Sequence, residues 1–140
     1  MRIIKLSTKE FKTLDEVIEW FKNDLPSRIE PGMCQITHGR IAKDKLNPGE
    51  PLLFTFQSRV VFLARTASGL RANYDEYQVR YPYYFLVDME KVRQVDIDLQ
   101  EIENQLHKAG FVKNFVITQG WPFVVDNPQT EALFLSWRGE

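Results

Sequence analysis

Two apolar runs separated by a short polar break dominate the middle of the sequence. The stretch GEPLLFTFQSRVVFLARTASG, residues 49–69, holds one run over 52–56 and a second over 60–65. Both runs have apolar residues at consecutive positions, whereas a strand with one solvated face alternates apolar and polar residues. A break of three polar residues is typical of a hairpin. The pattern therefore predicts two adjacent antiparallel strands that are buried on both faces.

Other short segments have the composition of strands. Apolar and β-branched residues recur in short runs bounded by turn residues, which is the usual strand signal. The segments predicted as strands are 2–6, 33–37, 83–88, 93–97, 111–117, 123–125 and 132–137.

Two helices are predicted from their capping residues. Thr13 and Glu16 have the spacing of a capping box, and an apolar stripe follows on one face as far as Asp24. Trp20 lies at the edge of this stripe, where a packing role is expected. A second helix is predicted to begin at Asp98 and to end before Gly110.

These elements predict an α+β fold. A chain of 140 residues fits one domain, and 44% hydrophobic with 26% charged residues is ordinary globular composition. We expect one domain over 1–140, with a curved, mostly antiparallel sheet or a small β-barrel flanked by two to three helices.

The sequence contains few signs of secretion, membrane insertion or catalysis. Cys34 is the sole cysteine, so no internal disulfide can form, and no apolar stretch is long enough to cross a membrane. We expect a cytoplasmic protein with no membrane association. Because the usual nucleotide, hydrolase and zinc motifs are missing, we assign no catalytic residue, metal or cofactor, and enzymatic activity stays open.

Basic residues are unevenly distributed along the chain. The whole chain has a net charge of −1, but residues 33–80 carry seven basic and four acidic side chains. A local basic excess can contact phosphates, although an ordinary solvated surface is the simpler reading. The candidate phosphate contacts are Arg40, Lys43, Lys45, Arg59, Arg65, Arg71 and Arg80.

An aromatic loop and an aromatic strand are candidates for base recognition. In QGWPF, Trp121 stands between a glycine and a proline, and a partly exposed indole there could stack on a base. Gln119 shares a face with Trp121 by strand alternation and could read a base edge, and Tyr83 is a second candidate ring. The alternative is that these rings fill hydrophobic corners.

Residues 46–88 resemble a known superfamily. LNPGEPLLFTF, then RVVFLARTASG, then the aromatic strand YPYYFLVD look like the PUA-like superfamily, particularly its EVE-type branch. Asn47-Pro48-Gly49-Glu50 occupies the turn that precedes the paired strands. The resemblance implies a PUA-like β-barrel that binds DNA or RNA, with a modified base held in an aromatic pocket and, in some members, a fused effector domain.

Two hypotheses about function follow. The first is a nucleic-acid-binding module that recognises a modified or flipped base and works with a fused or separate effector protein. The second is a protein-interaction or small-ligand-binding regulatory domain that does not bind nucleic acid, because the near-zero net charge gives little attraction to a polyanion.

Overall fold

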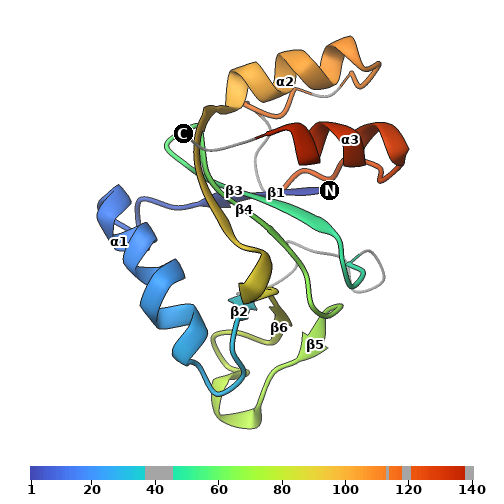
Figure 1. The fold of residues 1–140 in the computed structure, drawn as a ribbon. Coiled ribbons are helices and arrows are strands. Elements are labelled where there is room, and N and C mark those ends of the chain that lie inside the picture. The colour runs from blue at the N-terminus through green and yellow to red at the C-terminus, as the bar shows by residue number, and fades with distance from the viewer. Residues whose placement is uncertain (37–45, 113, 118–120, 138–140) are drawn as a thin grey trace.

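Two β-sheets and three α-helices form the described part of the chain (Figure 1). The structure, a computed structural model, describes residues 1–36, 46–112, 114–117 and 121–137. One sheet has the order β1–β3–β4–β7, made of β1 (Arg2–Leu6), β3 (Pro51–Phe56), β4 (Arg59–Arg65) and β7 (Arg93–Asp98). The other has the order β2–β6–β5, made of β2 (Met33–Ile36), β6 (Tyr83–Leu86) and β5 (Arg71–Ala72). The helices are α1 (Leu14–Glu19), α2 (Leu99–Lys108) and α3 (Pro128–Ser136).

The predicted central hairpin is present. β3 and β4 are antiparallel, and the turn between them consists of Gln57 and Ser58, both with positive φ (50° and 63°). Two such residues give the turn the right twist for a tight hairpin. Arg59, predicted as part of the turn, already belongs to β4 and pairs with Phe56. β1 adds in parallel on the other side of β3, so the sheet is mixed while its remaining pairs are antiparallel.

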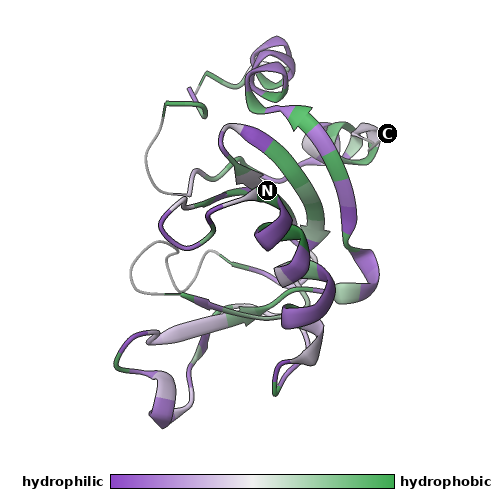
Figure 2. Cartoon of the chain, turned by 90° about the vertical axis from the view of Figure 1, so that its left-hand side faces the viewer, coloured by the Kyte–Doolittle hydropathy of each residue, from purple (hydrophilic) through white to green (hydrophobic). Residues whose placement is uncertain are grey.

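Both faces of the hairpin are covered, as the consecutive apolar residues predicted. Leu52 and Phe54 of β3 face a core that includes Val17 of α1, whereas Leu53 faces a core that includes residues of α2 and α3. Figure 1 shows α1 on one side of the sheet and α2 with α3 on the other. In Figure 2, hydrophobic colour runs along these strands, whereas much of the helix in front of them is hydrophilic.

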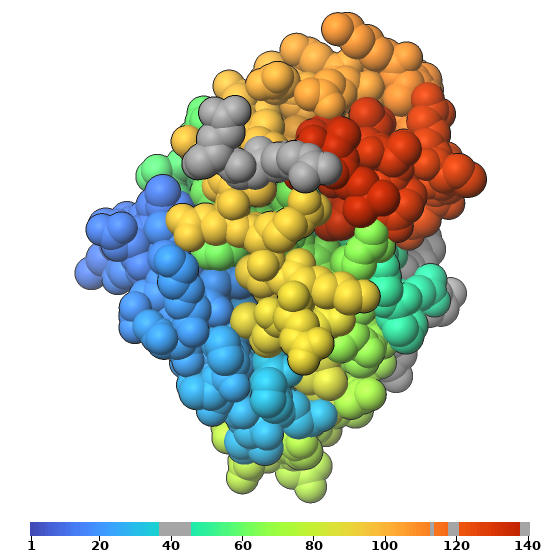
Figure 3. Space-filling view, viewed as in Figure 1, coloured from blue at the N-terminus to red at the C-terminus, as the bar shows by residue number. Residues whose placement is uncertain are grey.

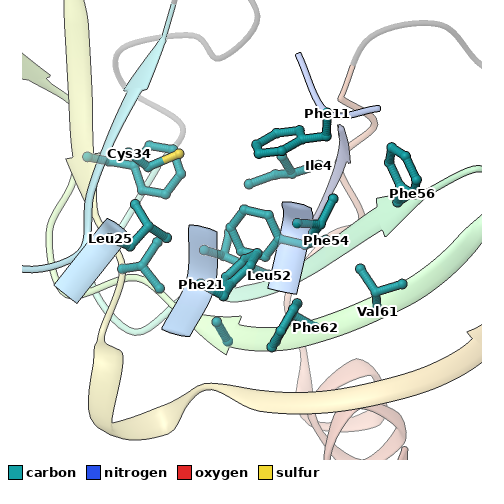
Figure 4. Packing of buried hydrophobic residues seen from close by; sticks show 14 of the residues in the cluster. Ile4, Phe11, Phe21, Leu25, Cys34, Leu52, Phe54, Phe56, Val61 and Phe62 are labelled. Carbon is teal, nitrogen blue, oxygen red and sulfur yellow. The ribbon is translucent and has the colours of Figure 1, made fainter. Parts of the chain in front are cut away.

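Aromatic rings dominate the core beneath α1 (Figure 4). Phe21 contacts Phe54 edge to face at 4.7 Å between ring centroids and stacks on Phe62 at 4.0 Å. Phe21 lies in a π-helical segment, Trp20–Asp24, that continues α1 and leads into a 3-10 turn, Leu25–Ser27. Each fully buried ring contributes about 1.5–3 kcal/mol relative to an exposed one. The described N-terminal helix thus follows the predicted boundaries, although its second half is not α-helical.

The capping signals were mostly correct. Thr13 and Glu16 form the predicted capping box. Asp98 caps α2, where its side chain accepts a hydrogen bond from the backbone N–H of Gln100. α2 ends before Gly110, which has the positive φ (99°) expected after a helix. Among the described residues, no helix is both long and apolar enough to cross a membrane.

The prediction of a strand over 132–137 was wrong, because these residues lie mainly in α3. The Asn127 side chain accepts hydrogen bonds from the backbone N–H groups of Gln129 and Thr130, and Pro128 occupies the first turn. These are strong helix-start features. A short apolar run alone does not distinguish a buried strand from a buried helix, and here the cap decides.

The predicted strands at 111–117 and 123–125 were also wrong for the described residues. Only Phe123 forms an isolated bridge, with Arg2. Residues 122–124 do run beside β1. The Ile3 N–H donates to the Pro122 carbonyl (3.0 Å), and the Val124 N–H donates to the Met1 carbonyl (2.8 Å). Pro122 has no N–H, so a regular ladder is interrupted there. The described strands form two open sheets rather than the barrel considered above.

On the face shown in Figure 3, the yellow segment that includes Met89–Lys91 and β7 lies between the blue N-terminal region and red α3. The two sheets and three α-helices confirm the predicted α+β class, with mostly antiparallel strand pairs and two to three flanking helices.

Alanine substitutions at two glycines with nearly equal φ values test how the chain enters β2. Gly32 has φ +83° and a Cβ there would lie 2.0 Å from the Val87 carbonyl oxygen, whereas Gly49 has φ +80° and open space around it. We expect Gly49→Ala to lower the free energy of unfolding by roughly 1–2 kcal/mol through backbone strain alone. Gly32→Ala should cost at least about 2 kcal/mol more, because strands β2 and β6 must separate to admit the methyl group. Urea unfolding measures both; equal losses would contradict this account of the β2 entry.

Candidate functional site

A small cavity opens where β1 ends. It has a volume of about 50 Å³ and is bordered by the ends of β1 and of the first helix, by β2, and by the segments before β6 and beside β1. Elements distant in sequence meet there because β1 lies beside β3 while β2 belongs to the second sheet. The cavity therefore lies at the junction of the two sheets.

Three aromatic side chains line this cavity: Trp20, Tyr81 and Trp121. Trp20 starts the π-helical segment and makes edge contacts with Phe11 (5.3 Å) and Phe21 (5.1 Å) between ring centroids. Trp121 is half-buried and packs against the same core. π-helical turns occur frequently at functional sites. Aromatic faces anchored in this way favour a flat apolar ligand.

Polar side chains complete the lining. Gln35 of β2 borders the cavity, and so do Ser7 and Glu10 from the chain that follows β1. The Oε1 atom of Gln35 accepts a hydrogen bond from Asn73 Nδ2 at 2.9 Å. The cavity can therefore offer both ring stacking and hydrogen bonding.

Lys5 also borders the cavity, but its ammonium group is used in the fold. It donates to the carbonyl oxygens of Phe115 (2.6 Å) and Val116 (3.2 Å). Partial burial lowers the pKa of this ammonium below its ordinary value, while nearby Glu103 opposes the shift. Lys5 thus anchors residues 115–116 over the end of β1.

The predicted base-reading residues are placed as follows. Trp121 lines the cavity. Gln119 lies outside the described residues. Tyr83 is half-buried in β6, where it pairs with Ile36 and Ala72, and the described cavity lining includes Tyr81 in its place.

The candidate phosphate-binding residues are dispersed. Arg59 pairs with Asp96 and lies at the same end of the sheet as Leu6, since Leu6 pairs with Phe56 and Phe56 with Arg59. Arg65 pairs with Glu131 at the opposite end.

Two further candidate arginines, Arg71 and Arg80, contact an acidic residue and a tyrosine, respectively. Arg71 contacts Glu30 at 3.4 Å, and the guanidinium of Arg80 lies 5.2 Å from the centre of the Tyr81 ring. Arg80 is therefore adjacent to the cavity through Tyr81. Arg40, Lys43 and Lys45 lie outside the described residues.

Trp20 and Gln35 were not predicted as site residues. Trp20 had a packing interpretation, which its contacts with Phe11 and Phe21 support, but it also faces the cavity. Gln35 is a polar residue between buried Cys34 and Ile36 in a short strand, and that interruption was the available signal. Their proximity to Trp121 depends on the tertiary fold.

The architecture of the described residues is α+β, with two β-sheets and three α-helices. No family model and no curated protein matches the sequence. Among solved structures, the chain is similar to the YTH domain of the MRB1 protein of Zygosaccharomyces rouxii, crystallised in complex with N6-methyladenosine RNA. The TM-score is 0.54 at 19% sequence identity, and the match covers 99% of this chain and 86% of that chain. At this identity the similarity shows the fold, which is YTH-like.

Cys34 provides a test of how closed the cavity is on the β2 side. Burial raises the pKa of its thiol to about 12, so the thiolate is scarce at neutral pH. We expect the folded protein to react with a thiol reagent at pH about 8 at least about a hundredfold more slowly than the unfolded protein, whose cysteine has an ordinary pKa near 8.5. Absorbance with Ellman's reagent, with and without guanidinium chloride, measures this ratio. Similar rates in both states would contradict the buried placement of Cys34.

Proposed function

We propose that this chain binds RNA through a modified base, which enters the cavity at the end of β1. The observation that carries the proposal is the meeting of Trp20, Tyr81 and Trp121 at one cavity. The fold supports it, because the similar YTH domain was crystallised with N6-methyladenosine RNA.

The chemistry of the lining suits a methylated base. Stacking on an aromatic side chain stabilises a bound base by roughly 1–3 kcal/mol, and every base has a face that can stack. Burying an added methyl group among apolar side chains contributes about 0.8 kcal/mol more. A base that leaves its stack to enter such a cavity must come from a single strand or be flipped out of a duplex.

The ion pairs of the candidate arginines favour weak contacts with the phosphate backbone of the RNA. Three of the arginines considered for phosphate contact are paired with carboxylates, Arg59 with Asp96, Arg65 with Glu131 and Arg71 with Glu30. Paired guanidinium groups release fewer counterions when a polyanion binds, so the affinity should depend only weakly on salt. In this proposal the base pocket, rather than the phosphate backbone, supplies most of the affinity.

The same pairing favours a second candidate, in which the ligand is a small molecule of the same chemistry, such as a free methylated nucleoside. The near-neutral chain and the arginine–carboxylate pairs would then have no polyanion to accommodate. The two candidates differ in whether the residues flanking the base add to the affinity.

Binding of a short RNA with one central N6-methyladenosine tests the proposal. We expect the wild type to bind this RNA more tightly than the same RNA with adenosine, and Trp121→Ala to weaken binding by roughly 5- to 150-fold through loss of stacking. Leu135→Ala, at a side chain that is 54% exposed on α3, is the control and should bind normally. Fluorescence anisotropy measures all three proteins.

Equal binding of both RNAs, or an unchanged affinity in Trp121→Ala, would contradict the proposed function. Binding of free N6-methyladenosine as tight as that of the RNA would support the small-molecule candidate instead.

A further inference from the structure

Two tyrosine rings stack on the outer face of the smaller sheet. Tyr84 of β6 pairs with Gln35 of β2 and with Arg71 of β5. Its neighbour Phe85 is buried in the core beneath α1, so alternation along β6 puts Tyr84 on the opposite face of the sheet. The ring of Tyr74 lies over that of Tyr84, with 6.0 Å between ring centroids and 26° between the ring planes.

Glu30 holds both rings in place. Its Oε2 atom accepts hydrogen bonds from the hydroxyl groups of Tyr74 and Tyr84, each at 2.6 Å. These bonds lower the pKa of the Glu30 carboxyl, and the same carboxylate raises the pKa of Tyr74 to about 12. At neutral pH the carboxylate is therefore charged and the Tyr74 hydroxyl is protonated. Arg71 contacts the other carboxylate oxygen at 3.4 Å and balances its charge.

Tyr74 is accessible although it is held in this way. It is 38% exposed, whereas Tyr84 beneath it is 5% exposed. An exposed aromatic ring can stack on any base, because every base has a flat face. A ring whose hydroxyl group and stacking partner already fix its position loses little further freedom when a ligand binds. Tyr74 is therefore a preformed stacking surface for one base.

This stacking surface and the cavity lie at the same end of the smaller sheet. β5 ends at Ala72 and β6 begins at Tyr83, and these two residues pair. Asn73, with 3% of its surface exposed, joins the segments that continue beyond them. Its Oδ1 atom accepts from the backbone N–H of Tyr74, and its Nδ2 atom donates to the carbonyl oxygen of Tyr81 in the cavity wall, both at 2.8 Å. One buried side chain thus links the backbone of Tyr74 to that of Tyr81.

We infer that Tyr74 stacks on a base that flanks the modified base, so that the cavity and Tyr74 hold two nucleotides of one RNA strand. The inference rests on the proposed function and names the ligand of that site as a strand rather than a free nucleoside. Stacking does not depend on base identity, and the Glu30–Arg71 pair has no net charge. The flanking contact should therefore tolerate any base and depend little on salt.

Abasic versions of the RNA test the inference. The parent RNA, with one central N6-methyladenosine, is compared with versions in which each flanking base in turn is replaced by an abasic ribose. For the wild type, we expect one of these replacements to weaken binding by about 5-fold or more, through loss of stacking on Tyr74. Exchanging that base for another should change binding by less than about 3-fold. Fluorescence anisotropy measures the affinities.

Substitutions at Tyr74 assign this penalty to its ring. In Tyr74→Ala the same abasic replacement should cost less than about 2-fold, because the ring that stacks on the base is gone. Tyr74→Phe keeps the ring and loses the hydroxyl, so it should retain most of the penalty. Val79→Ala, at a fully exposed side chain in the same segment between β5 and β6, is the control and should retain all of it.

The outcomes distinguish this inference from the proposed function. If the wild type binds the parent RNA but tolerates every abasic replacement, or if Tyr74→Ala keeps the full penalty, the inference is wrong and the proposed function stands. If the wild type does not bind the parent RNA, both fail. Should Tyr74→Ala not fold, the ring signals of Tyr74 in NMR spectra of the wild type decide: they should shift on addition of the parent RNA, and unshifted signals would overturn the inference.

Discussion

Burial of the β3–β4 hairpin on both faces is the constraint on which the rest of the fold depends. An internal hairpin with apolar residues at consecutive positions requires a separate cover for each face. α1 with its π-helical continuation covers one face, and α2 with α3 covers the other. The hydrophobic side chains of β3, from Leu52 to Phe56, are divided between the two cores.

This arrangement also locates the cavity. β1 adds in parallel to β3 and runs out at Leu6, so the chain must leave the sheet there to reach α1. The continuation of α1 brings Trp20 over that point, while the irregular segment beside β1 brings Trp121. The aromatic cavity is therefore a consequence of how the first strand ends, and β2 of the neighbouring sheet forms another of its walls.

Sequence patterns predicted the elements that local signals specify. Consecutive apolar residues identified β3 and β4, and the Thr13 and Glu16 capping box identified the start of α1. The predictions failed where a short apolar run had no decisive local signal, as at 132–137, whose helix depends on the cap at Asn127. At the site, the loop containing Trp121 was recognisable from its own residues, but the contributions of Trp20 and Gln35 depend on contacts between distant segments.

The central claim is that a base binds between the aromatic side chains of this cavity. The chain has three tryptophans, and the indole N–H of Trp137 donates to Gln105 Oε1 (2.8 Å) in the core between α2 and α3, remote from the cavity. Titration with the N6-methyladenosine RNA, followed by the three indole N–H signals in NMR spectra, tests the claim most directly. The account predicts large shifts for Trp20 and Trp121 and little change for Trp137. A shift confined to Trp137, or no shift in any of the three at RNA concentrations that saturate binding, would contradict it.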